Sequence, residues 1–214
     1  MNHEKAQLIA IARRMNQAGL NQGTSGNLSL RIGRERFLIT PSAVAYDRLE
    51  PDDIVEMTLG GDASGRLAPS NEWRVHRDLY EGRDDAGAVL HSHSPWAMSV
   101  ASLRRDLPPF HYMIMLAGGP SVRCAEYATY GTQELSDAVF SALERRRACL
   151  LANHGLLCLE SSLERVFALA VEIETLCRVY LQSLAAGEPV LLSDEELATV
   201  GEKFASYGDG WKML

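Results

Sequence analysis

One short segment combines an apolar run with two histidines: Ala88-Val89-Leu90-His91-Ser92-His93. The run of Ala, Val and Leu predicts a buried strand. Side chains two apart in a strand leave the same face, so His91 and His93 point in one direction. A pair of imidazoles on one face can chelate a single metal ion, but the His-x-His pattern is common by chance. It becomes informative only with further ligands elsewhere in the chain.

Two further side chains are suited to complete such a metal site. His154 follows an apolar strand predicted over 148–152 and precedes Gly155, which places it at a strand-to-turn junction near the end of the sheet. We expect Glu72 in the first turn of a helix that reaches about Tyr80, where the helix dipole favours a carboxylate. Three neutral imidazoles and one carboxylate suit Zn²⁺ with an exchangeable fourth position.

A simpler interpretation of these residues stays open at this point. Each histidine could be an unrelated side chain whose ring is satisfied by local hydrogen bonds. His76 follows Glu72 by four residues and lies on the same helix face. We expect it to be such a structural histidine and not a metal ligand.

Three short loops are rich in small hydroxyl and amide residues, which suggests an anion site. They are 23–27 (Gly-Thr-Ser-Gly-Asn), 40–42 (Thr-Pro-Ser) and 69–71 (Pro-Ser-Asn). The third loop precedes a predicted helix, whose free backbone N–H groups favour a phosphate. Each loop taken alone is also compatible with an ordinary cap or turn. The sequence has neither G-x-x-x-x-G-K nor G-x-G-x-x-G, so nucleotide binding has no support.

Composition and charge narrow the class of protein. The sequence has 214 residues, of which 46% are hydrophobic and 23% charged, as in a globular chain. Its 21 Lys and Arg against 28 Asp and Glu give a net charge of −7, which argues against a nucleic-acid or anionic-membrane partner. No apolar run approaches the ~18 residues of a transmembrane helix, and the polar N-terminus does not resemble a signal peptide. We therefore expect a cytoplasmic protein. Its four cysteines show no C-x-x-C spacing, and we expect them to be reduced thiols.

No internal repeat or low-complexity linker divides the sequence, so we expect a single domain of α/β structure. Helical patterns flank a middle region of strands, which indicates a mixed sheet covered by helices. One helix is expected over 135–146, with the basic cluster Arg145–Arg147 at its C-terminal end, where cations suit the dipole. The clearest helix is expected over 163–185, beginning with a capping box of Ser161 and Glu164.

Several of these segments also carry a family resemblance. The chain resembles the class II aldolase/adducin family almost from end to end, and within it the members that cleave L-fuculose 1-phosphate. The matching segments follow in order: 20–29 (LNQGTSGNLS), 39–42 (ITPS), 72–76 (EWRVH), 91–94 (HSHS), 111–114 (HYMI), 127–132 (YATYGT), 153–156 (NHGL) and 202–208 (EKFASYG). The resemblance implies one class II aldolase-type domain over 1–214, with a central mixed, largely antiparallel β-sheet covered by helices on both sides.

The resemblance also assigns roles around a metal ion. It implies one Zn²⁺ per subunit held by His91, His93 and His154, with Glu72 as a fourth ligand at rest and as the proton-transfer group during turnover. The ion would stabilise the enediolate formed when a sugar phosphate is cleaved, so no Schiff-base lysine is required. The few lysines agree with this, because they lie near the termini and away from the site loops: Lys5, Lys203 and Lys212.

A sugar phosphate and a second subunit complete the implied site. The phosphate would be bound by a set of loop residues: Thr24, Asn27, Ser42, Ala43, Ser70 and Asn71. Tyr112 would protonate the aldehyde oxygen across a subunit interface of a four-fold homotetramer, and Tyr207 would close over the site. The family usually has Gly in place of Ala43 and Ser in place of Asn71. The Ala43 methyl would crowd the phosphate if its backbone requires a positive φ.

The implied reaction is the reversible cleavage of L-fuculose 1-phosphate to dihydroxyacetone phosphate and L-lactaldehyde. The main alternative is another family activity on a different sugar phosphate, such as a ribulose-phosphate aldolase, an epimerase or a decarboxylase. A non-catalytic binding domain like that of the adducins is a more distant alternative. It predicts loss of the metal ligands, which this chain retains.

Overall fold

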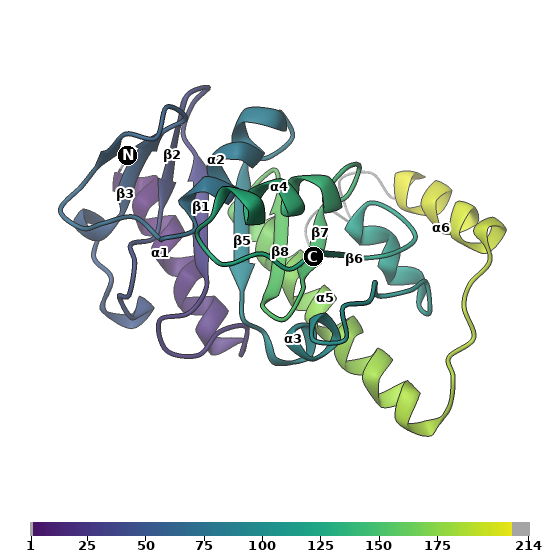
Figure 1. The fold of residues 1–214 in the computed structure, drawn as a ribbon. Coiled ribbons are helices and arrows are strands. Elements are labelled where there is room, and N and C mark those ends of the chain that lie inside the picture. The colour runs from purple at the N-terminus through teal and green to yellow at the C-terminus, as the bar shows by residue number, and fades with distance from the viewer. Residues whose placement is uncertain (1, 207–214) are drawn as a thin grey trace.

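The strands form one sheet in the order β4-β3-β2-β1-β5-β8-β7-β6 (Figure 1). The computed structural model describes residues 2–206, and eight strands lie within this range: β1 (Asn27–Arg31), β2 (Arg36–Ile39), β3 (Val55–Thr58), β4 (Ala63–Ser64), β5 (Ala88–Ser92), β6 (Arg123–Ala125), β7 (Ala148–Leu151) and β8 (Gly155–Glu160). Neighbouring strands are antiparallel except for β6 and β7, which are parallel. The sheet is thus mixed and largely antiparallel, as expected.

Helices cover both faces of this sheet (Figure 1). The described residues form six α-helices: α1 (Asn2–Gln17), α2 (Trp73–Gly82), α3 (Pro95–Ala101), α4 (Gln133–Ala142), α5 (Leu163–Ala186) and α6 (Asp194–Ser206). Helices α1, α3 and α5 lie on one face, and α2 and α4 pack together on the other. Helix α6 contacts the 3₁₀ helix η3 (Tyr112–Ala117) near β6. This is the three-layer α/β arrangement that the sequence predicts.

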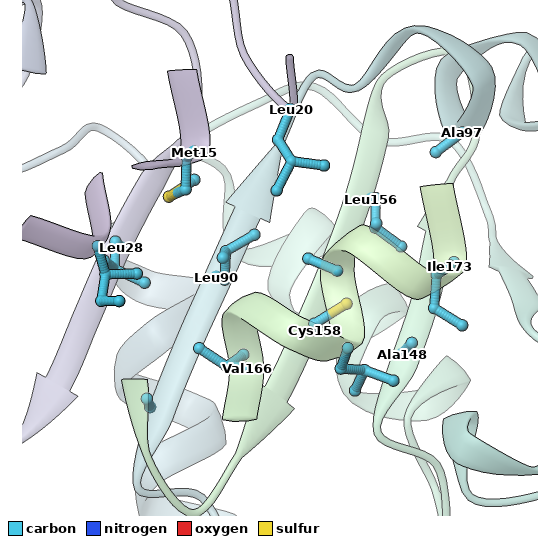
Figure 2. Close-up of a cluster of buried hydrophobic side chains, with 14 of the residues drawn as sticks. Met15, Leu20, Leu28, Leu90, Ala97, Ala148, Leu156, Cys158, Val166 and Ile173 are labelled. Atoms are coloured by element: carbon cyan, nitrogen blue, oxygen red, sulfur yellow. The ribbon is translucent and has the colours of Figure 1, made fainter. Parts of the chain in front are cut away.

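The face under α1, α3 and α5 holds one apolar core, shown in Figure 2. Alternate strand residues supply its sheet side, among them Leu28, Leu90 and Cys158, which are fully buried. Helix α5 contributes Val166 and Ile173. Burial of a large aliphatic side chain stabilises a fold by about 1.5–3 kcal/mol. These contacts fix α5 across the centre of the sheet.

The opposite face packs against α2 and α4. Strand residues of the other parity point to this side, including Phe37, Val89 and Leu157. His91 has the same parity in β5 as Val89, so its ring leaves the sheet on the side of α2. The period of two in β5 therefore sets the face on which the predicted metal ligands lie.

Helix α4 is shorter than the sequence suggests. It ends at Ala142 and not at residue 146. The chain turns there, and Arg145 has a left-handed φ of 56°, which no helix continues through. The cluster Arg145–Arg147 therefore connects the turn to β7 and does not end the helix, which corrects the prediction.

Helix α5 begins where expected but with a different cap. The Oγ of Ser162 accepts a hydrogen bond from the backbone N–H of Arg165, so Ser162 and not Ser161 is the N-cap. With Ser162 as the N-cap, the N3 residue is Arg165, so Glu164 is out of position for a capping box, and its carboxylate pairs with Arg14 at 2.6 Å. The prediction was wrong by one residue, since Ser161 and Ser162 offer the same hydroxyl chemistry in sequence.

Two expectations from composition can be compared with the structure. All four cysteines are free thiols, as predicted, and Cys149, Cys158 and Cys177 are buried. None of the helices within residues 2–206 combines the length and apolar character needed to cross a membrane.

A substitution of Gly87 tests the close packing at the start of β5. A Cβ at this position would lie 2.2 Å from the Ser161 carbonyl oxygen. We expect Gly87→Ala to lower the free energy of unfolding by about 1–3 kcal/mol, because the backbone must shift to accept the methyl group. Urea denaturation measures the change.

Gly201→Ala in α6 is the matched control. The added Cβ would meet only the Met115 methyl, at an ordinary 3.6 Å. Replacing a helical glycine in this way should stabilise the protein by about 0.5–1 kcal/mol. Equal destabilisation by both substitutions would contradict the packing between Gly87 and Ser161.

Candidate active site

Three histidine rings converge at the end of β5. The ligand atoms of His91, His93 and His154 all lie within 4.8 Å of one another. The ring centroids are 4.9, 4.8 and 5.0 Å apart in pairs, and the Nε2 atoms of His91 and His93 are 3.1 Å apart. Residues 2–206 contain no second cluster of this kind, and His76 is not part of it. The structure thus brings the three predicted ligands together.

The pairing of β5 with β8 produces this convergence. Strands β7 and β8 form a hairpin, and β8 lies antiparallel to β5 with Leu157 opposite His91. The hairpin turn contains Asn153 with a left-handed φ of 53°, followed directly by His154. Gly155 lets the hairpin close against β5, since a Cβ there would lie 2.3 Å from the carbonyl oxygen of Ser92.

Glu72 completes a possible ligand set. Its Oε2 lies 3.3 Å from His91 Nε2, and its Oε1 lies 3.5 Å from His154 Nε2. Glu72 is the N-cap residue of α2 and not in its first turn as predicted. The helix begins one residue later because Ser70 forms the preceding turn, where its Oγ accepts a hydrogen bond from Glu72 N at 3.3 Å. The carboxylate still lies at the positive end of the helix dipole.

The protonation states of these side chains suit a cation. Burial lowers the pKa of His91 to about 4 and also lowers the pKa of His93, so both rings are neutral near pH 7. Burial alone would raise the pKa of Glu72, but His91, His154 and the Asn27 amide outweigh it, and the pKa of Glu72 is lowered. Neutral imidazoles and an ionised carboxylate are the forms that bind Zn²⁺. The donor set therefore fits this ion.

Hydrogen bonds outside the cluster orient two of the histidines. His91 Nδ1 donates to the Leu156 carbonyl oxygen at 3.0 Å, which leaves the Nε2 lone pair for a metal ion. The backbone N–H of His93 donates to Asn21 Oδ1 at 2.9 Å. Gly26 leaves room for Asn21, because a Cβ on it would lie 2.5 Å from the Asn21 amide. Sequence analysis missed Asn21, since a buried amide in a turn-rich segment gives no signal before the fold is known.

A cavity of about 390 Å³ opens beside the histidines. It is bordered by Glu72, His93 and His154 together with all six residues predicted to bind phosphate: Thr24, Asn27, Ser42, Ala43, Ser70 and Asn71. Two of the contributing loops lie side by side, because Ser42 N donates to the Ala68 carbonyl and Ser70 N donates to the Thr40 carbonyl, each at 3.1 Å. Hydroxyl, amide and backbone N–H donors thus share one cavity with the histidine cluster.

Ala43 has the left-handed backbone that makes its methyl group important. Its φ is 59°, a conformation that costs a residue with a Cβ about 1–2 kcal/mol. Ala43 also borders the cavity. The backbone at Ala43 thus has the positive φ at which its methyl group is expected to crowd a phosphate, and its N–H is still present as a donor.

Two tyrosines without an assigned role also border the cavity. Tyr127 and Tyr130 are 57% and 66% exposed. The Arg104 guanidinium lies 5.5 Å from the Tyr127 ring centroid and donates to Asn153 Oδ1 at 2.6 Å. This links the tyrosine loop to the turn that carries His154. The YATYGT segment contains both tyrosines, but no spacing rule indicates that they reach the site.

Neither of the two tyrosines predicted to act in catalysis is found at the cavity among the described residues. Tyr112 lies on η3, is 48% exposed and packs near Phe204 of α6, with 6.3 Å between the ring centroids. It is not among the residues that border the cavity of its own chain. Tyr207 lies outside the described residues.

Comparison with known proteins identifies the family. Residues 6–181 match the family described as Class II Aldolase and Adducin N-terminal domain. The chain belongs to this family. The chain is 41% identical to a solved L-fuculose 1-phosphate aldolase and aligns with it at a TM-score of 0.90. The alignment covers 94% of this chain and 95% of the solved aldolase. The match confirms the α/β fold.

Two relatives of this class II aldolase carry different substrate names. A Rhodospirillum rubrum protein named 5-methylthioribulose-1-phosphate/5-deoxyribulose-1-phosphate aldolase is 46% identical over 206 residues, 96% of this chain and 93% of its own. The Escherichia coli L-fuculose phosphate aldolase is 46% identical over 203 residues, 94% of each chain. The chain is accordingly a carbon–carbon lyase. Equal identity does not select between the sugars.

Two buried histidines make the stability of the metal-free protein depend on pH. Burial lowers the pKa of His91 to about 4 and that of His76 to about 3, from 6.5. Below about pH 6.5 the unfolded chain binds protons that the native chain does not, so stability falls by up to about 1.4 kcal/mol per pH unit for each histidine. We expect the urea midpoint of chelator-treated protein to fall from pH 7 to pH 5.

The variant His76→Gln provides the control for this pH dependence. It removes one of the two buried titrating rings, so the slope between pH 7 and pH 5 should be shallower. The carboxylates titrate mainly below this range. A urea midpoint that stays constant in the unsubstituted protein would show that these rings are not buried in the neutral form.

Proposed function

We propose that this class II aldolase cleaves a ketose 1-phosphate reversibly to dihydroxyacetone phosphate and an aldehyde, with one Zn²⁺ per subunit. One observation carries the proposal: His93 and His154 of the histidine cluster border the same cavity as the hydroxyl-rich loops. A ketose 1-phosphate has its phosphate on C1 and its carbonyl and hydroxyl groups on C2 and C3. It can therefore contact both regions at once.

The phosphate end of the proposed site consists of hydrogen-bond donors. Thr24, Ser42 and Ser70 offer hydroxyls, Asn71 offers an amide, and Ala43 offers its backbone N–H. No Lys or Arg is found among the described residues that border the cavity. The charge of the phosphate is then balanced by these donors and by the positive end of α2.

Cleavage of the bond between C3 and C4 leaves negative charge on C3, which a group in the site must stabilise. His91, His93 and His154 would hold the Zn²⁺, which would supply Lewis acidity for the charge left on C3. In the condensation direction Glu72, a fourth ligand at rest, would accept a proton from C3 of dihydroxyacetone phosphate. In cleavage the C4 hydroxyl gives up one proton and C3 gains one, so no net proton is needed, and the protonated Glu72 would deliver the proton to C3. Its lowered pKa supports this role, because the carboxylate is ionised and ready to accept a proton at neutral pH.

The aldehyde oxygen needs its own proton donor in the condensation direction. We assign this role to Tyr112 of a neighbouring subunit in a homotetramer. Two features support the assignment: the Tyr112 ring is half exposed, and it lies away from the cavity of its own chain. A site completed by a second subunit accounts for both.

L-Fuculose 1-phosphate is the proposed substrate. The resemblance of the matched segments and the Escherichia coli relative named for this sugar support it. A 5-deoxyribulose 1-phosphate is the second candidate, because the Rhodospirillum rubrum relative of equal identity is named for that class. The complete ligand set of His91, His93, His154 and Glu72 disfavours an adducin-like binding role.

A substrate panel tests this function. We expect release of dihydroxyacetone phosphate from L-fuculose 1-phosphate with a higher kcat/KM than from 5-deoxyribulose 1-phosphate or 5-methylthioribulose 1-phosphate, measured in a coupled assay. A chelator should abolish activity and added Zn²⁺ should restore it. His91→Ala should lose metal and activity together, because two imidazoles and one carboxylate hold Zn²⁺ weakly.

The panel also has outcomes that contradict the proposal. A higher kcat/KM for a 5-deoxyketose 1-phosphate would replace L-fuculose 1-phosphate by the second candidate. Full activity of His91→Ala in metal-free buffer, or no dihydroxyacetone phosphate from any sugar by the zinc-loaded protein, would refute the proposed chemistry.

The role of Tyr112 generates a separate prediction. Tyr112→Phe should lower kcat by about 10²–10⁴-fold, the usual contribution of a general acid, while Zn²⁺ content stays unchanged. Tyr180→Phe, a partly buried tyrosine on α5, is the control and should retain activity. If Tyr112 acts across an interface, mixed assemblies of Tyr112→Phe and His91→Ala subunits should regain activity. Loss of zinc from Tyr112→Phe, or no recovery in mixed assemblies, would contradict this role.

A further inference from the structure

We infer that His76, Ser29 and Tyr80 are positioning residues, which fix the Asn27 amide and through it the carboxylate of Glu72. Four hydrogen bonds join these five side chains in one line. Tyr80 Oη lies 2.7 Å from Ser29 Oγ, which lies 2.6 Å from His76 Nδ1. His76 Nε2 lies 2.5 Å from Asn27 Oδ1, and Asn27 Nδ2 donates to Glu72 Oε2 at 2.9 Å.

The line is buried between two elements. Asn27 and Ser29 are alternate residues of β1, and His76 and Tyr80 are one turn apart on α2. These four residues are between 0% and 3% exposed. Since water cannot substitute for a lost partner there, each donor must face an acceptor.

The carboxylate determines the direction of every bond in the line. An ionised Glu72 only accepts hydrogen bonds, so Asn27 must turn its Nδ2 toward it and its Oδ1 toward His76. His76 must then carry its proton on Nε2 and accept from Ser29 Oγ at Nδ1. Ser29 in turn accepts from the Tyr80 hydroxyl. Burial, which lowers the pKa of His76 to about 3, agrees with a ring that holds one proton.

If each hydrogen bond in the line ran in the opposite direction, two hydrogen-bond acceptors would face each other. With the proton on Nδ1, His76 Nε2 would need a donor, and Asn27 would have to present its Nδ2 there. The Asn27 oxygen would then face Glu72 Oε2 in a buried site, which is strongly unfavourable. The arrangement therefore holds Asn27 in one of its two amide orientations.

This arrangement has a consequence for the role of Glu72. With Oε2 held by Asn27, Oε1 is left to exchange a proton, and it lies 3.5 Å from His154 Nε2. A carboxylate whose rotamer is fixed before the reaction avoids reorganisation during proton transfer. This step rests on the proposed function of Glu72, whereas the orientation of the line does not.

A spectroscopic measurement tests the orientation without any assay of activity. Long-range ¹H–¹⁵N correlation of histidine-labelled protein at pH 7.5 distinguishes the two neutral tautomers of His76, with His76→Gln used to assign the signal. We expect the Nε2–H tautomer. A Nδ1–H tautomer, a charged ring or a mixture of forms would overturn the inference, even if the proposed aldolase activity is correct.

Matched variants test the effect on catalysis. The amide of Gln reaches the position of His Nε2, so His76→Gln can still donate to Asn27, whereas the shorter His76→Asn can reach only Ser29. We expect His76→Asn to lower kcat by about 10–100-fold with zinc content and KM little changed, and His76→Gln to retain most of the activity. Equal kcat for the two variants would contradict a positioning role.

A pair of serine variants separates positioning from general loss of packing. Ser29→Ala removes the donor to His76, while Ser136→Ala removes an equally buried hydroxyl that donates to Asp78 at 2.6 Å, outside this line. Only Ser29→Ala should lower kcat. A similar fall in both variants would show that Ser29 contributes stability alone, and unchanged kcat in Ser29→Ala would exclude it from the line.

Discussion

The pairing of β8 with β5 is the constraint on which the site depends. His91 in β5 and His93, which directly follows the strand, point to the same side, but His154 reaches them only because the β7–β8 hairpin lies against β5. A slip of β5 by one residue would turn both histidines to the opposite face. Gly155 allows β8 to approach β5 closely in this register, since a Cβ there would clash with the Ser92 carbonyl oxygen.

Helix α2 connects the predicted metal ligands to the rest of the fold. Its N-terminus carries Glu72, beside the histidine cluster and the loops that border the cavity. One and two turns further along, His76 and Tyr80 hydrogen-bond to side chains of β1. The same helix thus places a carboxylate beside the histidine cluster and connects it to a buried strand.

Sequence reasoning could pair two of the predicted ligands because strand periodicity is local: the spacing of His91 and His93 requires only an extended chain through the end of β5. The three hydroxyl-rich loops are recognisable by composition, and the structure brings residues of all three to one cavity. The partners of His76 were not predictable, because Asn27 lies 49 residues away and nothing in the sequence indicates the contact. The sequence predicts the strand over 148–152 and the turn after it, but we assigned no element to the residues of β8. The aromatic border formed by Tyr127 depends on a loop conformation that no pattern encodes.

The most direct test of the account is anomalous X-ray diffraction from crystals of zinc-loaded protein, recorded at the zinc absorption edge. The account predicts one strong peak per chain at about 2.0–2.1 Å from the Nε2 atoms of His91, His93 and His154. A peak at other residues, or a zinc-loaded chain in which any of the three rings points away from the ion, would contradict it.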